Sequence, residues 1–137
     1  MKTTYLRNKI LDHMLGGPDY TRPATVYVAL FNAAPSIAGG GTEVSGGSYA
    51  RVAVTNDATN WPAASSGQKS NGLAVTFAQA TASWGTVTHA AIFDALTGGN
   101  MLHFTTLPNP RTVKLADDRT DEWVARFREL QIAATPS

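Results

Sequence analysis

Two apolar runs around a glycine turn constrain the fold of this chain most. The first run is Val87–Phe93 and the second is Met101–Leu107, with Thr97-Gly98-Gly99-Asn100 between them. Glycines supply the positive φ angles that tight hairpin turns require. The sequence therefore predicts a β-hairpin whose two-residue turn is Gly98-Gly99.

The register of this hairpin decides where its histidines lie. A two-residue turn places His103 opposite Asp94 as a cross-strand hydrogen-bond pair, with His89 near Pro108. His89 then shares a face with Phe93, while His103 points to the other face. One metal ion cannot bind both histidines in this register, so we predict no metal site here.

Several other segments have the pattern of short strands. Thr25 to Phe31 is apolar on both faces, which is typical of a strand covered on both sides. Ser48 to Thr55 alternates, as a half-buried strand does. Leu73 to Ala78 alternates as well, and Arg111 to Leu115 is a further short strand. The sequence Pro108-Asn109-Pro110 excludes central-strand pairing at that point.

The N-terminal segment has the pattern of a short amphipathic helix. Thr3 or Thr4 can cap it, and Gly16-Gly17 followed by Pro18 can end it. Its apolar stripe consists of Leu6, Ile10, Leu11, Met14 and Leu15. Two partners for this stripe remain open, the protein's own sheet and a neighbouring subunit.

The C-terminal segment fits two secondary structures. Trp123, Phe127 and Leu130 have helical spacing, whereas Trp123-Ala125-Phe127 and Leu130-Ile132 fit strands with a bulge between them. We favour strands, and whether 123–137 closes this sheet or a partner's stays open.

These elements together predict a mainly β fold. Turn signals between short strands favour an antiparallel, jelly-roll-like β-sandwich with a short N-terminal α-helix. We predict a single domain over 1–137, with the helix in 1–17, the sandwich in 24–137 and a long polar loop at 56–71. At 137 residues, such a domain can bury roughly two thirds of its unfolded surface.

Composition excludes several classes of protein. The chain has no cysteine, which rules out disulfides and thiolate chemistry. A net charge of +1 is too neutral for a nucleic-acid-binding protein. The chain has no membrane-length apolar run and no signal-peptide pattern, so we expect synthesis in the cytoplasm and no membrane partner. Charged residues make up only 15%, against about a quarter in typical domains. That depletion indicates either a surface that faces other protein or a bias of β-rich composition.

We find no arrangement of residues that predicts catalysis or a cofactor. The acidic run Asp117-Asp118-Arg119-Thr120-Asp121-Glu122 lacks the glycine of a calcium loop and contains a competing arginine, so we interpret it as a solvated turn. Asp94 with Glu43 is the one carboxylate pair to consider for glycan hydrolysis, and nothing in the sequence brings them together. We therefore predict no catalytic residue, no metal and no cofactor, and hence no enzyme.

Four segments of the chain carry a resemblance to a known family, namely Asn8–Gly17, Val26–Pro35, Gly41–Arg51 and Ser83–Leu102. In order and spacing they resemble a family of small bacteriophage virion proteins that are often labelled tail-fibre proteins. In size and strand pattern the chain is also similar to jelly-roll cement proteins of phage heads. The resemblance implies a non-enzymatic structural protein of the virion, made in the host cytoplasm.

Two locations in the virion follow from this resemblance. The first is a head cement or decoration protein that binds the major capsid protein and itself, as a dimer or trimer. The alternative is a tail-fibre or tail-tip accessory protein that contacts tail proteins or a host receptor. The predicted interface residues are Tyr5, Leu6, Ile10, Tyr20 and Trp61. Trp61 is expected to be exposed in the polar loop, as an aromatic interface anchor.

Overall fold

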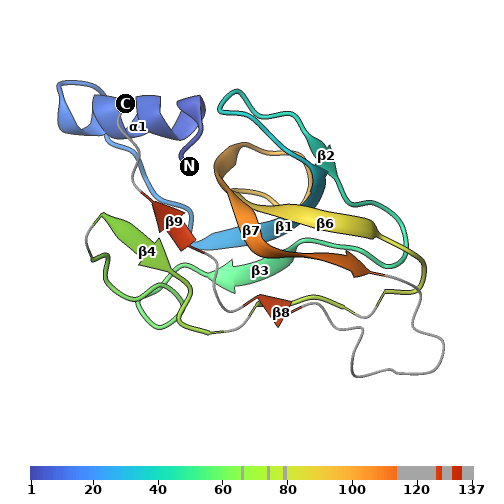
Figure 1. Ribbon diagram of the computed structural model, residues 1–137. Helices are drawn as coiled ribbons and strands as arrows, with labels where there is room; N and C mark the ends of the chain where they lie inside the picture. Colours follow the sequence, from blue (N-terminus) through green and yellow to red (C-terminus); the bar gives the residue numbers. More distant parts are fainter. Residues whose placement is uncertain (66, 74, 79, 114–125, 128–130, 134–137) are drawn as a thin grey trace.

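The described residues form a mainly antiparallel β structure with one short helix at the N-terminal end (Figure 1). The computed structural model describes residues 1–113 apart from 66, 74 and 79, together with 126–127 and 131–133. The helix α1 spans Thr4–Met14, inside the segment predicted to contain it. The predicted fold class, mainly β with a short N-terminal helix, is confirmed.

One antiparallel sheet forms the framework, with the strand order β2-β1-β6-β7. The three long strands are β1 (Thr25–Ala33), β6 (Gly85–Phe93) and β7 (Met101–Val113). The far side of β1 is shared by two short strands, β2 (Thr42–Glu43) and β3 (Val52–Thr55). β3 pairs with the first half of β1 and β2 with its last residues, so the chain between them leaves the sheet and returns.

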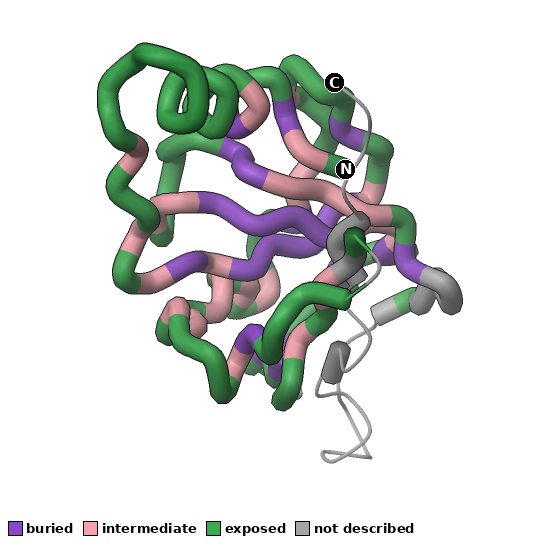
Figure 2. Tube along the Cα trace, turned by 90° about the vertical axis from the view of Figure 1, so that its left-hand side faces the viewer, coloured by how far each residue is buried: buried purple, intermediate pink, exposed green. Residues whose placement is uncertain are grey.

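Strand β1 lies in the middle of the sheet because both of its faces are apolar. Val26, Val28 and Leu30 face the larger core cluster, and Ala29 and Phe31 face a smaller one. Figure 2 shows the resulting buried (purple) segments running side by side through the middle of the molecule. The predicted coverage of this strand on both faces is confirmed.

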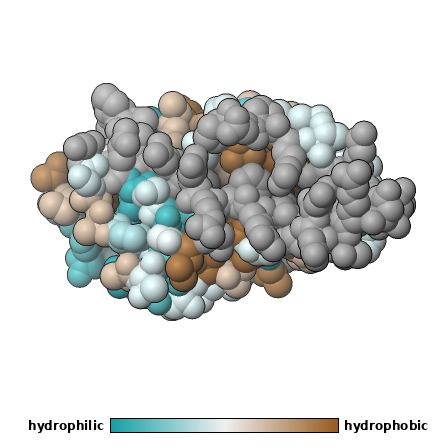
Figure 3. Space-filling view, turned by 60° about the horizontal axis from the view of Figure 1, so that its bottom comes forward, coloured by the Kyte–Doolittle hydropathy of each residue, from teal (hydrophilic) through white to brown (hydrophobic). Residues whose placement is uncertain are grey.

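The larger core lies between the sheet and the segment of residues 57–84. Trp61, Val75, Phe77, Ala80 and Trp84 from this segment are all buried in the cluster that contains Val28 and Leu30. Short strands hold the segment in place, namely β4 (Gln68–Ser70), which pairs with β9 (Gln131–Ala133), and β5 (Val75–Thr76), which pairs with β8 (Arg126–Phe127). A second layer of this kind is consistent with the predicted sandwich. Figure 3 shows apolar as well as polar surface on the lower side of the molecule.

The predicted polar loop at 56–71 is only partly correct. It contains the strand β4 and the buried side chain of Trp61, which is 6% exposed. Asp57 turns the chain inward, because its carboxylate accepts hydrogen bonds from the backbone N–H groups of Thr59 and Asn60. The backbone N–H of Trp61 then donates to the carbonyl of Asp57 (2.9 Å). The predicted strand over Leu73–Ala78 is likewise short: β5 is Val75–Thr76, and Leu73 is 56% exposed.

The hairpin of β6 and β7 forms, but with a longer loop than the sequence predicts. Phe93 pairs with Met101 and Ile92 with His103, so the two-residue turn and the pairing of His103 with Asp94 are both wrong. Asp94 instead closes the loop of residues 95–99, where its carboxylate accepts from the backbone N–H (2.7 Å) and Nδ2 (3.0 Å) of Asn100. These side-chain bonds reinforce the backbone bond from the Asp94 N–H to the Asn100 carbonyl (3.2 Å), and together they close the loop.

Strand β7 is an outer strand of the sheet, as its prolines require, but it runs unbroken from Met101 to Val113, so the separate strand predicted from Arg111 is wrong. Val87 pairs with Arg111 and His89 with Thr106, so the register shifts around Pro108 and Pro110. His89 thus pairs with Thr106 rather than lying near Pro108 as predicted. Near the hairpin, residues 1–3 cover the outer side of β7: Lys2 bridges to His103, and the backbone N–H of Thr3 donates to the carbonyl of Leu102 (3.0 Å).

The predicted strand structure of the C-terminal segment is confirmed where it is described. β8 and β9 are strands, and each pairs with a strand from the segment of residues 57–84. The acidic run at 117–122 and Trp123 lie outside the described residues. The single-domain organisation over 1–137 stays a prediction.

A network around Arg51 holds the excursion between β2 and β3 against the sheet. The Arg51 guanidinium donates to both carboxylate oxygens of Glu43 (2.9 Å each) and to the carbonyls of Ala95 (2.9 Å) and Gly98 (2.8 Å). It also lies 3.7 Å from the centroid of the Phe93 ring. The Arg51 side chain is 8% exposed. One buried guanidinium thus connects β2, β3 and the hairpin loop.

Tyr49 extends this network into the larger core. Its hydroxyl donates to Glu43 (2.7 Å) and accepts from the backbone N–H of Leu30 (3.0 Å). Its ring meets Trp84 edge-on, with centroids 5.5 Å apart, and the Trp84 indole donates to the carbonyl of Gly47 (3.0 Å). These contacts satisfy a backbone N–H of β1 where β2 and β3 leave a gap.

The network lowers the pKa of Glu43. Burial alone would raise this pKa, but the hydrogen bonds from Arg51 and Tyr49 and the charge of Arg51 outweigh that effect. A lowered pKa means that the folded protein binds this proton more weakly than the unfolded chain. The network therefore adds stability above the ordinary pKa of glutamate, and this contribution is lost as the pH falls through the lowered pKa.

We predict that Arg51→Lys destabilises the protein by about 2 kcal/mol, because an ammonium cannot make the two-pronged contact with Glu43 while also reaching two carbonyls. Urea unfolding followed by tryptophan fluorescence measures the change. Arg22→Lys, at an exposed arginine, is the matched control and should shift the midpoint little. Equal stability of Arg51→Lys and the wild type would contradict the role assigned to the network.

Candidate interaction surface

The start of helix α1 is fixed to the edge of the sheet by Thr3. The Thr3 hydroxyl caps the helix by accepting from the backbone N–H of Leu6 (3.3 Å), and it donates to the carbonyl of Met101 (2.6 Å). The next residue, Thr4, donates its backbone N–H to the carbonyl of Ile37 (2.8 Å). Thr3 is 2% exposed, which is unusual for a capping residue and reflects its second role as an anchor.

The rest of the helix extends away from this anchor. Leu6 is its one buried residue, and the exposed fraction of the other stripe residues rises along the helix. The values are 37% for Ile10, 45% for Leu11, 69% for Met14 and 77% for Leu15. Figure 2 shows this coil as exposed (green) along most of its length. The sequence leaves open whether the apolar stripe packs on the protein's own sheet or on a neighbouring subunit. Of the stripe residues, Leu6 alone is buried against the protein's own sheet.

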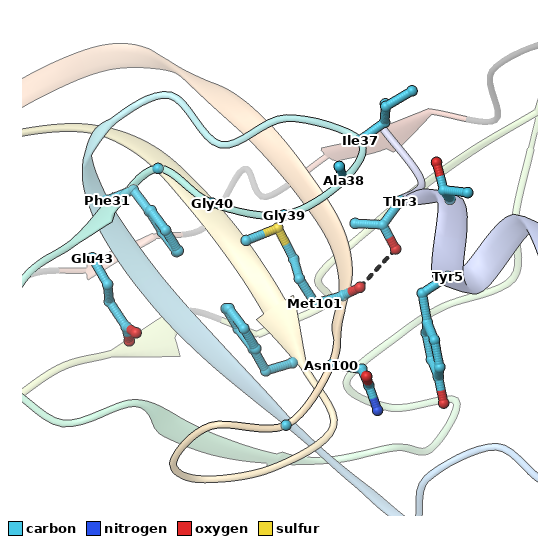
Figure 4. A pocket seen from close by; sticks show the side chains of 14 residues that line it. Thr3, Tyr5, Phe31, Ile37, Ala38, Gly39, Gly40, Glu43, Asn100 and Met101 are labelled. Atoms are coloured by element: carbon cyan, nitrogen blue, oxygen red, sulfur yellow. Dashed lines mark hydrogen bonds between the residues drawn. The ribbon is translucent and has the colours of Figure 1, made fainter.

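A first pocket, the helix–loop pocket, lies between the start of α1, the loop of residues 37–41 and the end of the hairpin. Its volume is about 620 Å³. Figure 4 shows Glu43 and Tyr5 toward its two ends, with Phe31 and Met101 between them. Three consecutive glycines of the loop, Gly39 to Gly41, line this pocket, and all three have positive φ.

Two polar residues at the helix–loop pocket, Glu43 and Asn100, are already engaged in hydrogen bonds. Both carboxylate oxygens of Glu43 accept from Arg51, and Asn100 donates to Asp94. Asp94 is occupied in turn by closing the hairpin loop. Neither carboxylate of the Asp94–Glu43 pair is therefore free to serve as a glycosidase acid or base in this arrangement.

A second pocket, the tryptophan pocket, lies beside Leu6 and has a volume of about 200 Å³. Its apolar walls are Leu6, Val26, Ile92 and Leu102 together with Pro23. Its polar lining consists of Tyr20, Arg22, Asn56, Trp61, Lys69 and His103. Trp61 Nε1 and His103 Nδ1 are both buried, and neither has a hydrogen-bond partner among the described residues.

The environment of His103 keeps its imidazole neutral. Burial lowers the pKa of His103 to about 4, and the nearby amino terminus and Lys2 act in the same direction. Burial also raises the pKa of Tyr20, whose phenol is therefore protonated at neutral pH. At neutral pH the charges at the lining of the tryptophan pocket thus come from Arg22 and Lys69.

The structure brings together three of the five residues predicted for the interface. Leu6, Tyr20 and Trp61 line the tryptophan pocket, whereas Tyr5 lines the helix–loop pocket and Ile10 is exposed on the helix. The expected exposure of Trp61 is wrong, because the Asp57 turn directs it into the core. Leu6 is buried as well, so neither residue lies on the exposed outer surface, although both line the tryptophan pocket.

Sequence reasoning missed the residues that organise these pockets. Arg51 gave no sign of its role beyond its place in the distinctive segment Gly41–Arg51. The sequence pairs His103 with Asp94 because it predicts a two-residue turn, whereas the hairpin loop is longer. Arg22 and Lys69 are far apart in the chain, and only the fold places them at one pocket.

Among the described residues, no group of three or more histidine, aspartate or glutamate side chains is placed to hold a metal ion. Within the same residues, no helix has the length and apolar content needed to span a membrane.

Comparison with known families decides what kind of protein carries this surface. Residues 1–122 match the family model described as podophage GP4 fiber I protein gp80. The chain belongs to this family. It is thus a structural protein of the phage virion, as the resemblance implied. A search of curated proteins finds no match to this chain. The gp80 family match includes all of α1, both pockets and the whole of the described sheet.

We predict that protonation of His103 weakens the fold. Its pKa is lowered from 6.5 to about 4, so the unfolded chain binds this proton more tightly. Stability from this group is complete above pH 6.5 and is lost as the pH falls toward 4, by up to about 3 kcal/mol. Urea unfolding at a series of pH values measures the effect.

Between pH 6.5 and 4, the free energy of unfolding should fall with a smaller slope against pH in the variant His103→Gln than in the wild type. His13→Gln replaces an exposed histidine and should keep the wild-type slope. Identical slopes for wild type and His103→Gln would show that His103 does not contribute.

Proposed function

We propose that this protein is a subunit of the phage fibre, where it serves as an accessory protein in contact with neighbouring tail proteins and the host surface. The family match carries this proposal, because the description names a fibre protein. The same description names no head component, so it favours the fibre alternative over the expected cement role at the major capsid protein.

The distal part of α1 is the surface that we assign to assembly. Ile10, Leu11, Met14 and Leu15 present exposed apolar side chains beyond the part of the helix that packs on the core through Leu6 and Tyr5. Burial of such side chains against a neighbour is worth about 25 cal/mol per Å² of apolar area. Tyr5 and Ile37, which is 40% exposed, lie near the first turn of the helix and extend the same surface toward the helix–loop pocket.

The low charge of the chain supports a role in assembly. Only 15% of its residues are charged, and its net charge is +1. A contact through the few exposed side chains of α1 is weak alone. Repeated copies of it in a symmetric fibre add avidity without any new kind of contact. The neighbour is a second copy of this chain or another tail protein, and either gains from the same apolar surface.

We expect an antibody to this chain to label the tail fibres of intact particles in electron micrographs. The measurement compares label counts on the head, the tail tube and the fibres. Label spread over the head would overturn the fibre assignment and support the cement role instead.

We predict that Ile10→Asp combined with Met14→Asp reduces incorporation of the protein into particles, because the carboxylates would have to be buried at the contact. Both positions are exposed, so the free energy of unfolding of the isolated variant should lie within about 0.5 kcal/mol of the wild-type value. Quantitative blotting of purified particles measures incorporation.

Leu96→Asp is the matched control, since Leu96 is 52% exposed but lies in the hairpin loop. Its incorporation should equal that of the wild type. Equal incorporation of the helix variant and the wild type would contradict attachment through α1.

A further inference from the structure

The charges around the tryptophan pocket favour an anion. Two basic residues line it, Arg22 shortly before β1 and Lys69 in β4. No aspartate or glutamate is among its described lining residues. Lys2 and the amino terminus add positive potential near His103. An anion that entered this pocket would meet two cations and no competing carboxylate from the described lining.

Two residues that line the pocket also carry buried polar atoms with no hydrogen-bond partner among the described residues. Trp61 is 6% exposed, and its Nε1 has no partner among the described residues. An indole N–H is a donor only, and leaving it unpaired in the interior costs about 1–3 kcal/mol. His103 Nδ1 is unpaired in the same way. A ligand that carries oxygen acceptors would recover this cost.

Size and wall chemistry restrict the ligand further. A volume of about 200 Å³ is below the range of roughly 300–1,000 Å³ that holds drug-sized ligands, so the pocket accepts one small ring rather than an extended molecule. Leu6, Val26, Ile92 and Leu102 form apolar walls that suit the C–H faces of such a ring. The partly exposed Tyr20 adds an aromatic surface and a hydroxyl.

We propose that the tryptophan pocket binds one acidic sugar unit of a host-surface polysaccharide, with its carboxylate at Arg22 and Lys69 and its hydroxyls toward Trp61 and His103. The proposal rests on the proposed fibre function, because a fibre subunit is presented to the host surface. It assigns recognition to a pocket beside Leu6, while the distal part of α1 remains available for assembly.

The test is a titration of the full chain, labelled with ¹⁵N, with glucuronate. Binding should shift the Trp61 indole resonance and raise the pKa of His103, because a bound carboxylate favours the imidazolium. Glucose is the neutral control and should leave both unchanged. Arg22→Gln and Lys69→Gln should each weaken glucuronate binding about tenfold, as expected when one charge-assisted hydrogen bond is lost.

Lys9→Gln is the matched control for charge, since Lys9 is exposed on α1 and is not part of the pocket lining. It should bind glucuronate as the wild type does. Circular dichroism of each variant establishes that the fold is kept before binding is compared.

Three results would overturn the proposal: no binding of glucuronate, equal binding of glucose, or unchanged binding by both pocket variants. Acetate that binds as tightly as glucuronate would also overturn it, because the site would then recognise a bare carboxylate. Failure here is distinct from failure of the fibre assignment, since particle labelling reports location whatever the pocket binds.

Discussion

The buried guanidinium of Arg51 is the interaction on which the rest of the sheet depends. β1 needs a neighbour along its whole length, yet the chain beside it is broken into β2 and β3. Arg51 joins the two sides of this break through Glu43, reaches the hairpin loop through two carbonyls and covers the Phe93 ring. Because its side chain is nearly fully buried, the charge is tolerated only as long as Glu43 remains ionised beside it.

Much of the fold follows from short-range patterns in the sequence. The apolar content of Thr25–Phe31 predicts a covered strand, and the prolines at 108 and 110 predict an edge strand. Both outcomes depend on backbone chemistry that acts locally. The helix is predictable for the same reason, since Thr3 can cap it and Gly16-Gly17 can end it.

The parts that could not be predicted depend on side chains that bond to the backbone of loops. Asp94 helps to close a hairpin loop that is longer than two residues, and this longer loop pairs His103 with Ile92 in place of Asp94. Asp57 similarly turns Trp61 inward from a segment that looks polar. The basic residues of the tryptophan pocket, Arg22 and Lys69, are far apart in the chain. Their spacing in the sequence gives no sign that the fold brings them to one pocket.

The attachment of Thr3 to β7 has a mechanical consequence. Residues 1–3 join the sheet about one hundred positions along the chain from their partners, whereas the other end of α1 continues directly toward β1. A force applied to the helix is therefore divided between the edge and the centre of the same sheet. At β7 this force acts on the hydrogen bonds of residues 1–3, and at Leu6 it acts on the larger core. Pulling the helix away thus breaks these hydrogen bonds and removes Leu6 from the core, and neither step breaks the pairing of β1 with β6.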